Sequence, residues 1–346
     1  MYAASSMTSP YRLIKNASLA GHNTFRVPAH AQLLVEVNDP RALPELLQLA
    51  EVRDQPALVL GEGSNVLFAR DPAGVVIVIT ARGMQLLGTD SAGARVHAAA
   101  GEHWNDLVRW SLAQDLCGLE NLSLIPGSVG AAPIQNIGAY GAELAENMIA
   151  VEAYDRERNE AVRLSREQCG FSYRQSRFKQ DPDRWIITGI ELQLQQDAPL
   201  KLDYSGVREE LSAMNITRPT ATDVSDAVCR LRRRKLPDPA VIGNAGSFFK
   251  NPVVSVEHAA QLSGVHPGLP VFDAADGKKL SAAWLIEQCG WKGFREGDAG
   301  VSEKHALVLV NHRHASGMQL WTLAQRIMDS VLEKFDIRLE PEPRIV

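Results

Sequence analysis

A glycine-rich stretch in the middle of the chain restricts the possible folds more than any other feature. Residues 124–141, LIPGSVGAAPIQNIGAYG, hold four glycines, two prolines and no charged side chain. Such a segment makes a poor helix and a poor strand, so we expect a tight loop in which a flat or anionic ligand lies against the backbone. Gln135 and Asn136 offer amide hydrogen bonds to such a ligand. The alternative is a buried glycine-rich crossover without a ligand.

A shorter glycine turn follows a predicted strand at residues 57–60. In residues 61–66, GEGSNV, the glycines allow backbone amides to approach a phosphate closely. The turn is not a dinucleotide fingerprint, because Val66 occupies the place of the third glycine and no helix is predicted after it. It is either a structural turn or a cradle for a pyrophosphate.

The local pattern changes from mixed α and β at the start to β-rich in the middle and mixed again at the end. Strands are expected at 33–37, 57–60, 75–79, 95–99, 151–155, 160–164, 185–194 and 306–310, and helices at 40–51, 103–116, 223–234, 256–262, 281–289 and 316–335. The prolines of KLPDP, residues 235–239, predict a rigid connection to the last unit. The apolar stripe of the final helix predicts a core-facing surface.

Composition excludes several classes of protein. The net charge of -5 at pH 7 argues against a nucleic-acid or anionic-membrane partner, because phosphate binding requires a basic surface. No run approaches the roughly 20 apolar residues of a membrane span, and the N-terminus lacks the apolar stretch of a secretory signal. The four cysteines form no C-x-x-C pair, which is typical of free thiols in a reducing compartment. We therefore expect a cytoplasmic protein that binds small molecules.

The remaining polar candidates have less specific patterns. The basic run at 230–235 is either a solvated helix face or a source of guanidinium groups for a diphosphate. Ser247, in GNAGSFFKNP, is either a turn residue or a donor to a bound anion or carbanion, and no G-x-S-x-G elbow supports hydrolase chemistry. The histidines show no ligand spacing, so no metal is expected. Glu340 and Glu342 would both be solvated on an extended tail.

Ten segments, in order, resemble the MurB family, the UDP-N-acetylenolpyruvoylglucosamine reductases. They run from Asn23 to Arg344 and read NTF, LGEGSNVL, AAAGEHW, GLENLSLIPGSVGAAPIQNIGAYG, FSYRQSRFK, RRRKLPDP, GNAGSFFKNP, AAWLIEQCG, HALVLVN and LEPEPR. The resemblance implies an α+β fold with the FAD-binding architecture of vanillyl-alcohol oxidase (PCMH type). It implies flavin-binding subdomains at 1–84, joined by the tail 337–346, and at 85–218, and a separate α+β substrate-binding domain at 219–336.

The resemblance also implies an activity. NADPH would reduce a non-covalent FAD, which would transfer hydride to the enolpyruvyl group of UDP-GlcNAc-enolpyruvate and yield UDP-N-acetylmuramate for peptidoglycan. The family implies a monomer. Two alternatives are an oxidase on the same FAD-binding fold and a non-catalytic nucleotide-sugar sensor, and turnover of NADPH would separate the sensor from the enzyme.

Roles follow from the resemblance residue by residue. Ser247 falls on the proton donor, Arg174 on the arginine that holds the carboxylate, and Glu342 on the acid that stabilises the developing enediolate. FAD is expected at Gly61, Gly63, Ser64, Asn65, Pro126, Gly127, Ser128, Gly130, Gln135, Asn136, Gly138, Tyr140, Arg232 and Arg344. Substrate is expected at Tyr173, Tyr204, Lys235, Lys250, Asn251 and His305. The segment around Tyr204, LDYSGV, departs from the usual L-x-Y-G-x-L, so the resemblance does not fix the conformation of this substrate-capping loop.

Overall fold

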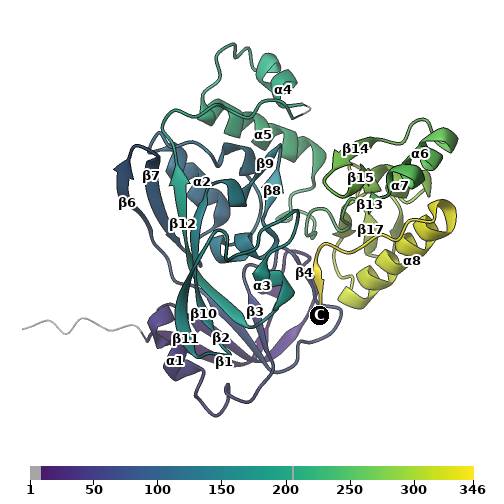
Figure 1. The fold of residues 1–346 in the computed structure, drawn as a ribbon. Helices are drawn as coiled ribbons and strands as arrows, with labels where there is room; N and C mark the ends of the chain where they lie inside the picture. Colours follow the sequence, from purple (N-terminus) through teal and green to yellow (C-terminus); the bar gives the residue numbers. More distant parts are fainter. Residues whose placement is uncertain (1–8, 205) are drawn as a thin grey trace, which may run out of the picture. The chain divides into compact units, whose positions relative to one another are not determined.

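The computed structural model describes residues 9–204 and 206–346 (Figure 1). Residues 1–8 and Ser205 lie outside the described residues. The first range belongs to the N-terminus in which no secretory signal is predicted, and Ser205 belongs to the predicted capping loop. Contacts group the chain into two compact units, each described by itself below. The first unit contains residues 9–17, 31–62 and 72–232, and the second contains 18–30, 63–71 and 233–346.

The first sheet of the first unit has the strand order β1-β2-β5-β3. β2 (His30–Val37) and β3 (Ala57–Leu60) both run parallel to β5 (Val75–Ile79), and β1 (Tyr11–Ser18) pairs with β2 at the edge. β5 is buried along its whole length, which is typical of a central strand in a parallel sheet. The predictions of β2, β3 and β5 are confirmed, whereas β1 was missed because its pattern is mostly exposed.

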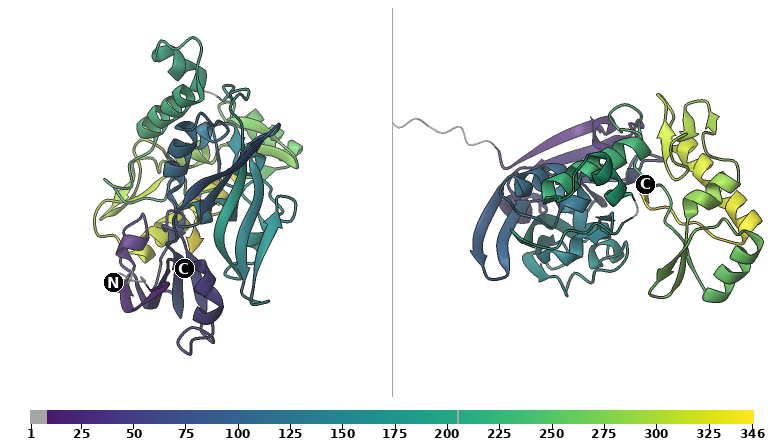
Figure 2. Two further views of the ribbon diagram at one scale, coloured as in Figure 1. Left: turned by 90° about the vertical axis from the view of Figure 1, so that its left-hand side faces the viewer. Right: turned by 90° about the horizontal axis from the view of Figure 1, so that it is seen from above.

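The second sheet is antiparallel, with the order β11-β10-β12-β7-β6. Its strands are β6 (Met84–Asp90), β7 (Gly93–Ala99), β10 (Met148–Asp155), β11 (Glu160–Ser165) and β12 (Trp185–Leu194). They lie side by side, in blue to teal, in the left view of Figure 2. The predicted hairpin is confirmed, because Asp155 of β10 pairs with Glu160 of β11.

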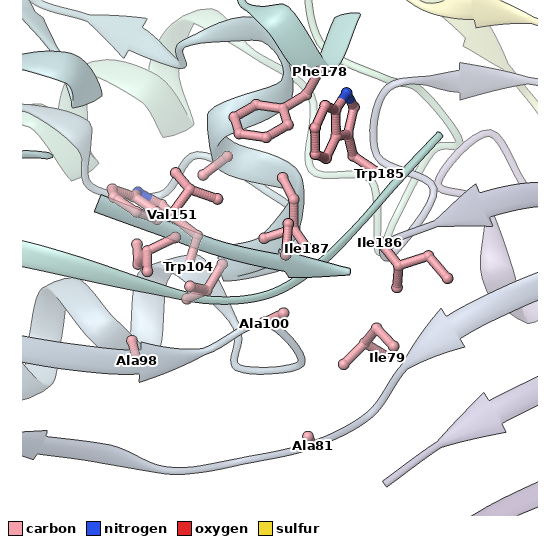
Figure 3. Close-up of a cluster of buried hydrophobic side chains, with 14 of the residues drawn as sticks. Ile79, Ala81, Ala98, Ala100, Trp104, Val151, Phe178, Trp185, Ile186 and Ile187 are labelled. Atoms are coloured by element: carbon pink, nitrogen blue, oxygen red, sulfur yellow. The ribbon is translucent and has the colours of Figure 1, made fainter. Parts of the chain in front are cut away.

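One hydrophobic core contains side chains from both sheets. α2 (Trp104–Leu112) contributes Trp104, which is 1% exposed and whose indole N–H donates to the Leu122 carbonyl at 2.9 Å. Figure 3 shows Phe178 and Trp185 within this core, and their ring centroids are 6.1 Å apart in an edge-to-face arrangement. The core therefore joins the strands to the segment that contains residue 178.

The glycine-rich segment contains more regular structure than expected. Residues Val129–Gln135 form the 3₁₀ helix η4, and β8 (Gly138–Ala139) pairs with β9 (Ala142–Glu143). The prediction that this stretch is neither helix nor strand is thus wrong in part. A 3₁₀ helix closes its bonds over three residues and forms in pieces too short for an α-helix, which suits a short run of small residues that includes Pro133. The rest of the segment is loop.

The helices of the first unit differ in how well their ends were predicted. α5 (Ala221–Lys235) is close to its expected span. The helix expected to reach residue 51 ends much earlier, as η2 (Pro40–Ala42) and α1 (Leu43–Leu46). Asp39 caps its start as expected by accepting a hydrogen bond from the Arg41 N–H, but the chain beyond Leu46 continues in turns. The other helices here are η3 (Glu120–Leu122), η5 (Leu144–Glu146), α3 (Arg177–Gln180) and α4 (Val207–Ala213).

The second unit packs helices against two small antiparallel sheets. One sheet consists of β13 (Val253–Val254), β15 (Gly277–Leu280) and β14 (Val271–Ala274), and the other of β16 (Arg295–Glu296), β17 (Ala299–Val301) and β18 (Leu309–Asn311). Its helices are η1 (Ala20–His22), α6 (Val256–Val265), α7 (Ala282–Gln288) and α8 (Gly317–Phe335). The predicted stripe of α8 is confirmed, since Leu320, Leu323, Ala324, Ile327, Val331 and Phe335 are all buried. The strand expected at 306–310 begins only at Leu309, because residues 305–308 form a turn.

The C-terminal tail forms a strand of the second unit. β19 (Arg344–Ile345) runs parallel to β4 (Val66–Leu67), with Arg344 opposite Val66. In Figure 1 the C-terminus lies beside β4. The predicted three-part division at residues 84/85, 218/219 and 336/337 remains a prediction, and most of α5 belongs to the first unit.

Candidate active site

Two of the predicted flavin loops touch within the first unit. A Cβ added to Gly61 would lie 2.7 Å from the Ser128 hydroxyl oxygen and 3.0 Å from the Ala131 methyl carbon. A larger residue at position 61 would therefore have to displace the Ser128 side chain where the turn after β3 meets the glycine-rich segment. No distance between these loops follows from the sequence, and the structure brings them into contact.

Arg232 is the strongest sign of an anionic ligand. It comes from α5, is only partly exposed, and its Nε donates to the Leu124 carbonyl at 3.2 Å. Burial lowers the pKa of its guanidinium. Among the described residues no carboxylate forms an ion pair with it. Because enclosed charges are costly unless paired, this guanidinium fits a diphosphate group such as that of FAD.

A charged cluster beside the same loops was missed by the sequence reasoning. His103 caps the start of α2, forms a β-bridge with Ser128, and its Nδ1 bonds the Glu62 carboxylate. Its Nε2 lies 3.4 Å from Arg82, which also bonds Glu102 at 3.3 Å. The segment AAAGEHW, residues 98–104, contains Glu102 and His103. No sequence spacing predicts that these two side chains lie together with those of Glu62 and Arg82.

Arg174, the predicted carboxylate ligand, sits in a strained turn. Its φ is +55°, a left-handed conformation that is uncommon for a residue with a side chain. Its guanidinium donates to the Gly138 carbonyl at 2.6 Å and lies 5.4 Å from the centroid of the Tyr173 ring. Tyr173 is 44% exposed. The structure thus places two predicted substrate residues next to β8 of the glycine-rich segment.

The capping loop approaches the glycine-rich segment through aromatic contact. The Tyr204 and Tyr140 rings meet edge to face, with centroids 5.2 Å apart. Asn121, which is 2% exposed, donates both amide hydrogens, to the Tyr140 carbonyl at 2.8 Å and to the Lys201 carbonyl at 2.9 Å. The Lys201 ammonium also bonds the Glu146 carboxylate. Asn121 was not among the predicted site residues.

In the second unit, backbone hydrogen bonds join Glu342 to the segment that follows Ser247 in the sequence. The Glu342 N–H donates to the Phe248 carbonyl at 2.8 Å, and Phe249 forms a β-bridge with Pro341. Asn65 donates its side-chain amide to the Glu342 carbonyl at 3.3 Å. The backbone of Glu342 is therefore bonded to the residue that follows Ser247 and to Asn65, a predicted FAD residue.

The turn that carries Ser247 is fixed by buried groups. Phe248 and Phe249 are 0% and 1% exposed, and the Phe248 N–H donates to the Leu307 carbonyl at 2.7 Å. On the other side, Gly246 has a φ of +69° and its N–H donates to the buried Asn244 side chain at 3.0 Å. Ser247 itself is partly exposed. These bonds hold the backbone on both sides of Ser247.

Other predicted substrate residues also have partners within the second unit. The Lys250 ammonium lies 2.7 Å from the Glu340 carboxylate, so Glu340 is exposed but paired. The Asn251 side-chain oxygen accepts from the Ala282 N–H at the start of α7 at 3.0 Å. Burial lowers the pKa of His305, and the nearby charge of Lys235 lowers it further.

The predicted residues thus fall into two clusters. The first unit holds Gly61, Pro126, Gly127, Ser128, Gly130, Gln135, Asn136, Gly138, Tyr140, Tyr173, Arg174, Tyr204 and Arg232. The second holds Gly63, Ser64, Asn65, Lys235, Ser247, Lys250, Asn251, His305, Glu342 and Arg344. Over the described ranges, no group of three His, Cys, Asp or Glu side chains could hold a metal ion. No helix of the described chain is long and apolar enough to cross a membrane.

Comparisons with known proteins agree with this architecture. Residues 31–165 match the FAD binding domain family, and residues 238–346 match the family described as "UDP-N-acetylenolpyruvoylglucosamine reductase, C-terminal domain". Together with the mixed α and β content, the first match defines a protein of the FAD-binding class, and the predicted fold class is confirmed.

Relatives match nearly the whole chain. A UDP-N-acetylenolpyruvoylglucosamine reductase of Xanthomonas oryzae pv. oryzae is 52% identical over 338 residues, 97% of each chain. One of Xylella fastidiosa is 51% identical over 341 residues, 98% of this chain and 97% of the relative. The crystal structure of the Thermus caldophilus reductase (MurB) is similar with a TM-score of 0.66 and 26% identity, over 97% of this chain and 98% of that one. The chain belongs to the UDP-N-acetylenolpyruvoylglucosamine reductase family.

Proposed function

We propose that the protein is an FAD-dependent reductase that converts UDP-GlcNAc-enolpyruvate to UDP-N-acetylmuramate in the cytoplasm, with NADPH as reductant, in peptidoglycan synthesis. The observation that carries the proposal is family membership over 97% of the chain. The proposal extends to a monomer with non-covalent FAD. No histidine or cysteine lies within residues 61–66 or 124–141 for covalent attachment.

The residues of the first unit fit FAD. The two glycine loops present backbone to a ligand, and the enclosed, carboxylate-free guanidinium of Arg232 matches a diphosphate. In the second unit, the other proposed cofactor contacts are Gly63, Ser64, Asn65 and Arg344, and Arg344 pairs with Val66, which directly follows Asn65. When bound, FAD supplies the hydride. The protein supplies binding, orientation and electrostatics.

Hydride addition to an enolpyruvyl double bond places negative charge on the adjoining carboxylate. We assign Arg174 to bind that carboxylate, since a guanidinium forms two parallel hydrogen bonds to it. Glu342, in its protonated form, would donate a hydrogen bond to the developing enediolate. Both interactions strengthen as charge develops, so they lower the barrier instead of merely tightening substrate binding.

The second step adds a proton to the neighbouring carbon, and we assign this step to Ser247. A hydroxyl is a weak acid, so the intermediate must be strongly basic and the donor must be held in place. The buried rings of Phe248 and Phe249 and the Gly246 turn provide that rigidity. The serine would regain its proton from solvent through the partly exposed side of the turn.

The activity is tested on the purified holoprotein under anaerobic conditions. We expect paired flavin bands in the visible spectrum, bleaching on addition of NADPH, and recovery of the bands on addition of UDP-GlcNAc-enolpyruvate. Recovery with oxygen but not with the UDP-sugar would indicate an oxidase instead. Absence of bleaching by NADPH in flavin-loaded protein would favour a non-catalytic sensor.

The role of Ser247 has its own test by rapid mixing. Ser247→Ala should leave the reduction of the flavin by NADPH intact and slow reoxidation by the UDP-sugar by about 10²- to 10⁴-fold, the usual contribution of a general acid. Ser302→Ala, which changes another buried serine of the second unit, is the control and should leave reoxidation unchanged. Near wild-type reoxidation in Ser247→Ala would remove Ser247 from the mechanism.

A further inference from the structure

The loop that carries Arg174 is attached to the glycine-rich segment by two buried polar side chains. We define the arginine loop as residues 172–179. Ser176 is 0% exposed, and its hydroxyl donates to the Ile134 carbonyl at 2.6 Å. Asn136 is 1% exposed, and its side-chain amide donates to the Ser172 carbonyl at 3.2 Å. These two bonds attach the arginine loop on either side of Arg174.

The side chain of Asn136 is fully engaged with protein groups. Besides the bond to Ser172, its Nδ2 donates to the Glu143 carboxylate at 2.8 Å, and its Oδ1 accepts from the Ala145 N–H at 2.9 Å. Both amide hydrogens are thereby used. A flavin contact of Asn136 would have to come from its backbone, which is in the left-handed region with a φ of +44°.

The arginine loop needs such attachments because its backbone is strained. A φ of +55° at Arg174 persists only when surrounding contacts over-determine it. Ser176 contributes by capping α3, since its hydroxyl also accepts from the Lys179 N–H at 3.3 Å. The Lys179 ammonium in turn donates to the Arg174 carbonyl at 3.1 Å. Each bond restricts the same short turn.

We propose that Asn136 and Ser176 are positioning residues that set Arg174 against the flavin-binding segment for the reaction with the UDP-sugar. The proposal rests on the proposed function, in which Arg174 holds the substrate carboxylate. A misplacement of about 1 Å can cost two orders of magnitude in rate. Neither residue needs to touch substrate, so loss of either should slow the step that uses Arg174 and spare reduction by NADPH.

Ser176→Ala provides the cleanest measurement because it removes one anchor and leaves the cofactor loop unchanged. In the holoenzyme, flavin reoxidation by UDP-GlcNAc-enolpyruvate should slow by about tenfold or more, while reduction by NADPH stays within about twofold of wild type. Ser111→Ala is the matched control, since Ser111 is also 0% exposed and its hydroxyl donates to the Val108 carbonyl at 2.8 Å within α2. It should leave both half-reactions unchanged.

Asn136→Asp tests the other anchor, with Glu143→Gln as a partial rescue. The single variant places two carboxylates together and should lose both flavin affinity and reoxidation rate. The double variant Asn136→Asp with Glu143→Gln restores a donor and acceptor pair between positions 136 and 143, but still offers no donor to the Ser172 carbonyl. We therefore expect it to recover flavin content and thermal stability while reoxidation remains slow.

The last test asks whether the effects of Ser176→Ala and Arg174→Lys on the reoxidation rate are additive. In an Arg174→Lys background, Ser176→Ala should add little further loss, because residues that act through one another are not additive. Additive losses, equal slowing of both half-reactions, or full recovery of reoxidation in the double variant would each overturn the positioning role. A wild-type flavin that the UDP-sugar fails to reoxidise would instead refute the proposed function, so the two failures are distinguishable.

Discussion

Replacement of Arg232 by methionine should have opposite effects on the empty protein and on cofactor binding. The guanidinium is enclosed enough for burial to lower its pKa, and its Nε donates to a neutral carbonyl, that of Leu124. Without a ligand, the protein pays to desolvate this charge. Methionine fills a similar volume without a charge, so the flavin-free protein should be as stable as wild type or more stable.

The magnitude follows from the bonds that the guanidinium would make to a diphosphate. A hydrogen bond to a charged group contributes about 1.5–3 kcal/mol, so loss of one or two such bonds should weaken FAD binding by about 10- to 10⁴-fold. Removal of the Leu124 bond costs about 1 kcal/mol, which the relieved desolvation should offset. The stabilisation of the protein by saturating FAD should shrink by the same free energy as the binding.

The assay combines equilibrium FAD titration of the flavin-free protein with thermal unfolding in the presence and absence of FAD. Arg230→Met is the control, since it removes an exposed cation from the same helix and should change neither quantity by much. If Arg232→Met destabilises the flavin-free protein and leaves the FAD dissociation constant unchanged, Arg232 is a structural tie to Leu124 and the diphosphate assignment is refuted.

Three further predictions concern other charged and titrating groups. Glu342→Gln should lose most of the reoxidation rate measured by rapid mixing, whereas Glu340→Gln, which removes only the exposed partner of Lys250, should keep it; equal losses would contradict the assignment. Arg163 and Arg95 hold the pKa of the buried Glu191 at about 2, so a stabilisation of at most about 3 kcal/mol is present above pH 5 and is lost as the pH falls towards 2. Glu191→Gln should flatten this part of the curve of unfolding free energy against pH, and an unchanged curve would refute the contribution. Burial raises the pKa of the Cys169 thiol to about 12, so thiol reagents at pH 8 should modify it only after unfolding; rapid modification in the native protein would show that the residue is accessible.

Local periodicity explains why much of the fold was predictable. The buried runs of β2, β3 and β5 and the stripe of α8 depend on which faces are apolar, and that information lies within each segment. β1 and β6 were missed for the same reason. Both are edge strands with mostly exposed side chains, so their sequences carry little apolar alternation. The helix predicted at 40–51 was too long, because the turns that follow α1 resemble a continued helix in their amino-acid composition.

The supports of the site were less predictable than its members. Arg174, Ser247 and Glu342 fall on motifs that the family resemblance carries, so the sequence is enough to propose them as site residues. Asn121, Ser176 and His103 each bond at least one group far away in the chain, such as the Lys201 carbonyl that accepts from Asn121, 80 residues earlier. Such a bond requires no repeated spacing and leaves no pattern. Only the fold shows which carbonyl each side chain reaches.

The C-terminal tail shows how Glu342, a proposed site residue near the end of the chain, is held in place by backbone bonds. The last residues of a chain usually fray unless backbone bonds attach them. Here the Glu342 N–H bonds the Phe248 carbonyl, the Arg344 N–H bonds the Asn65 carbonyl at 3.0 Å, and the Val346 N–H bonds the Leu67 carbonyl at 3.0 Å. The tail therefore joins the serine turn to the turn after Gly63. Because the same few bonds order both turns, a ligand that binds either one should also stabilise the tail, and fraying of the tail should disturb both.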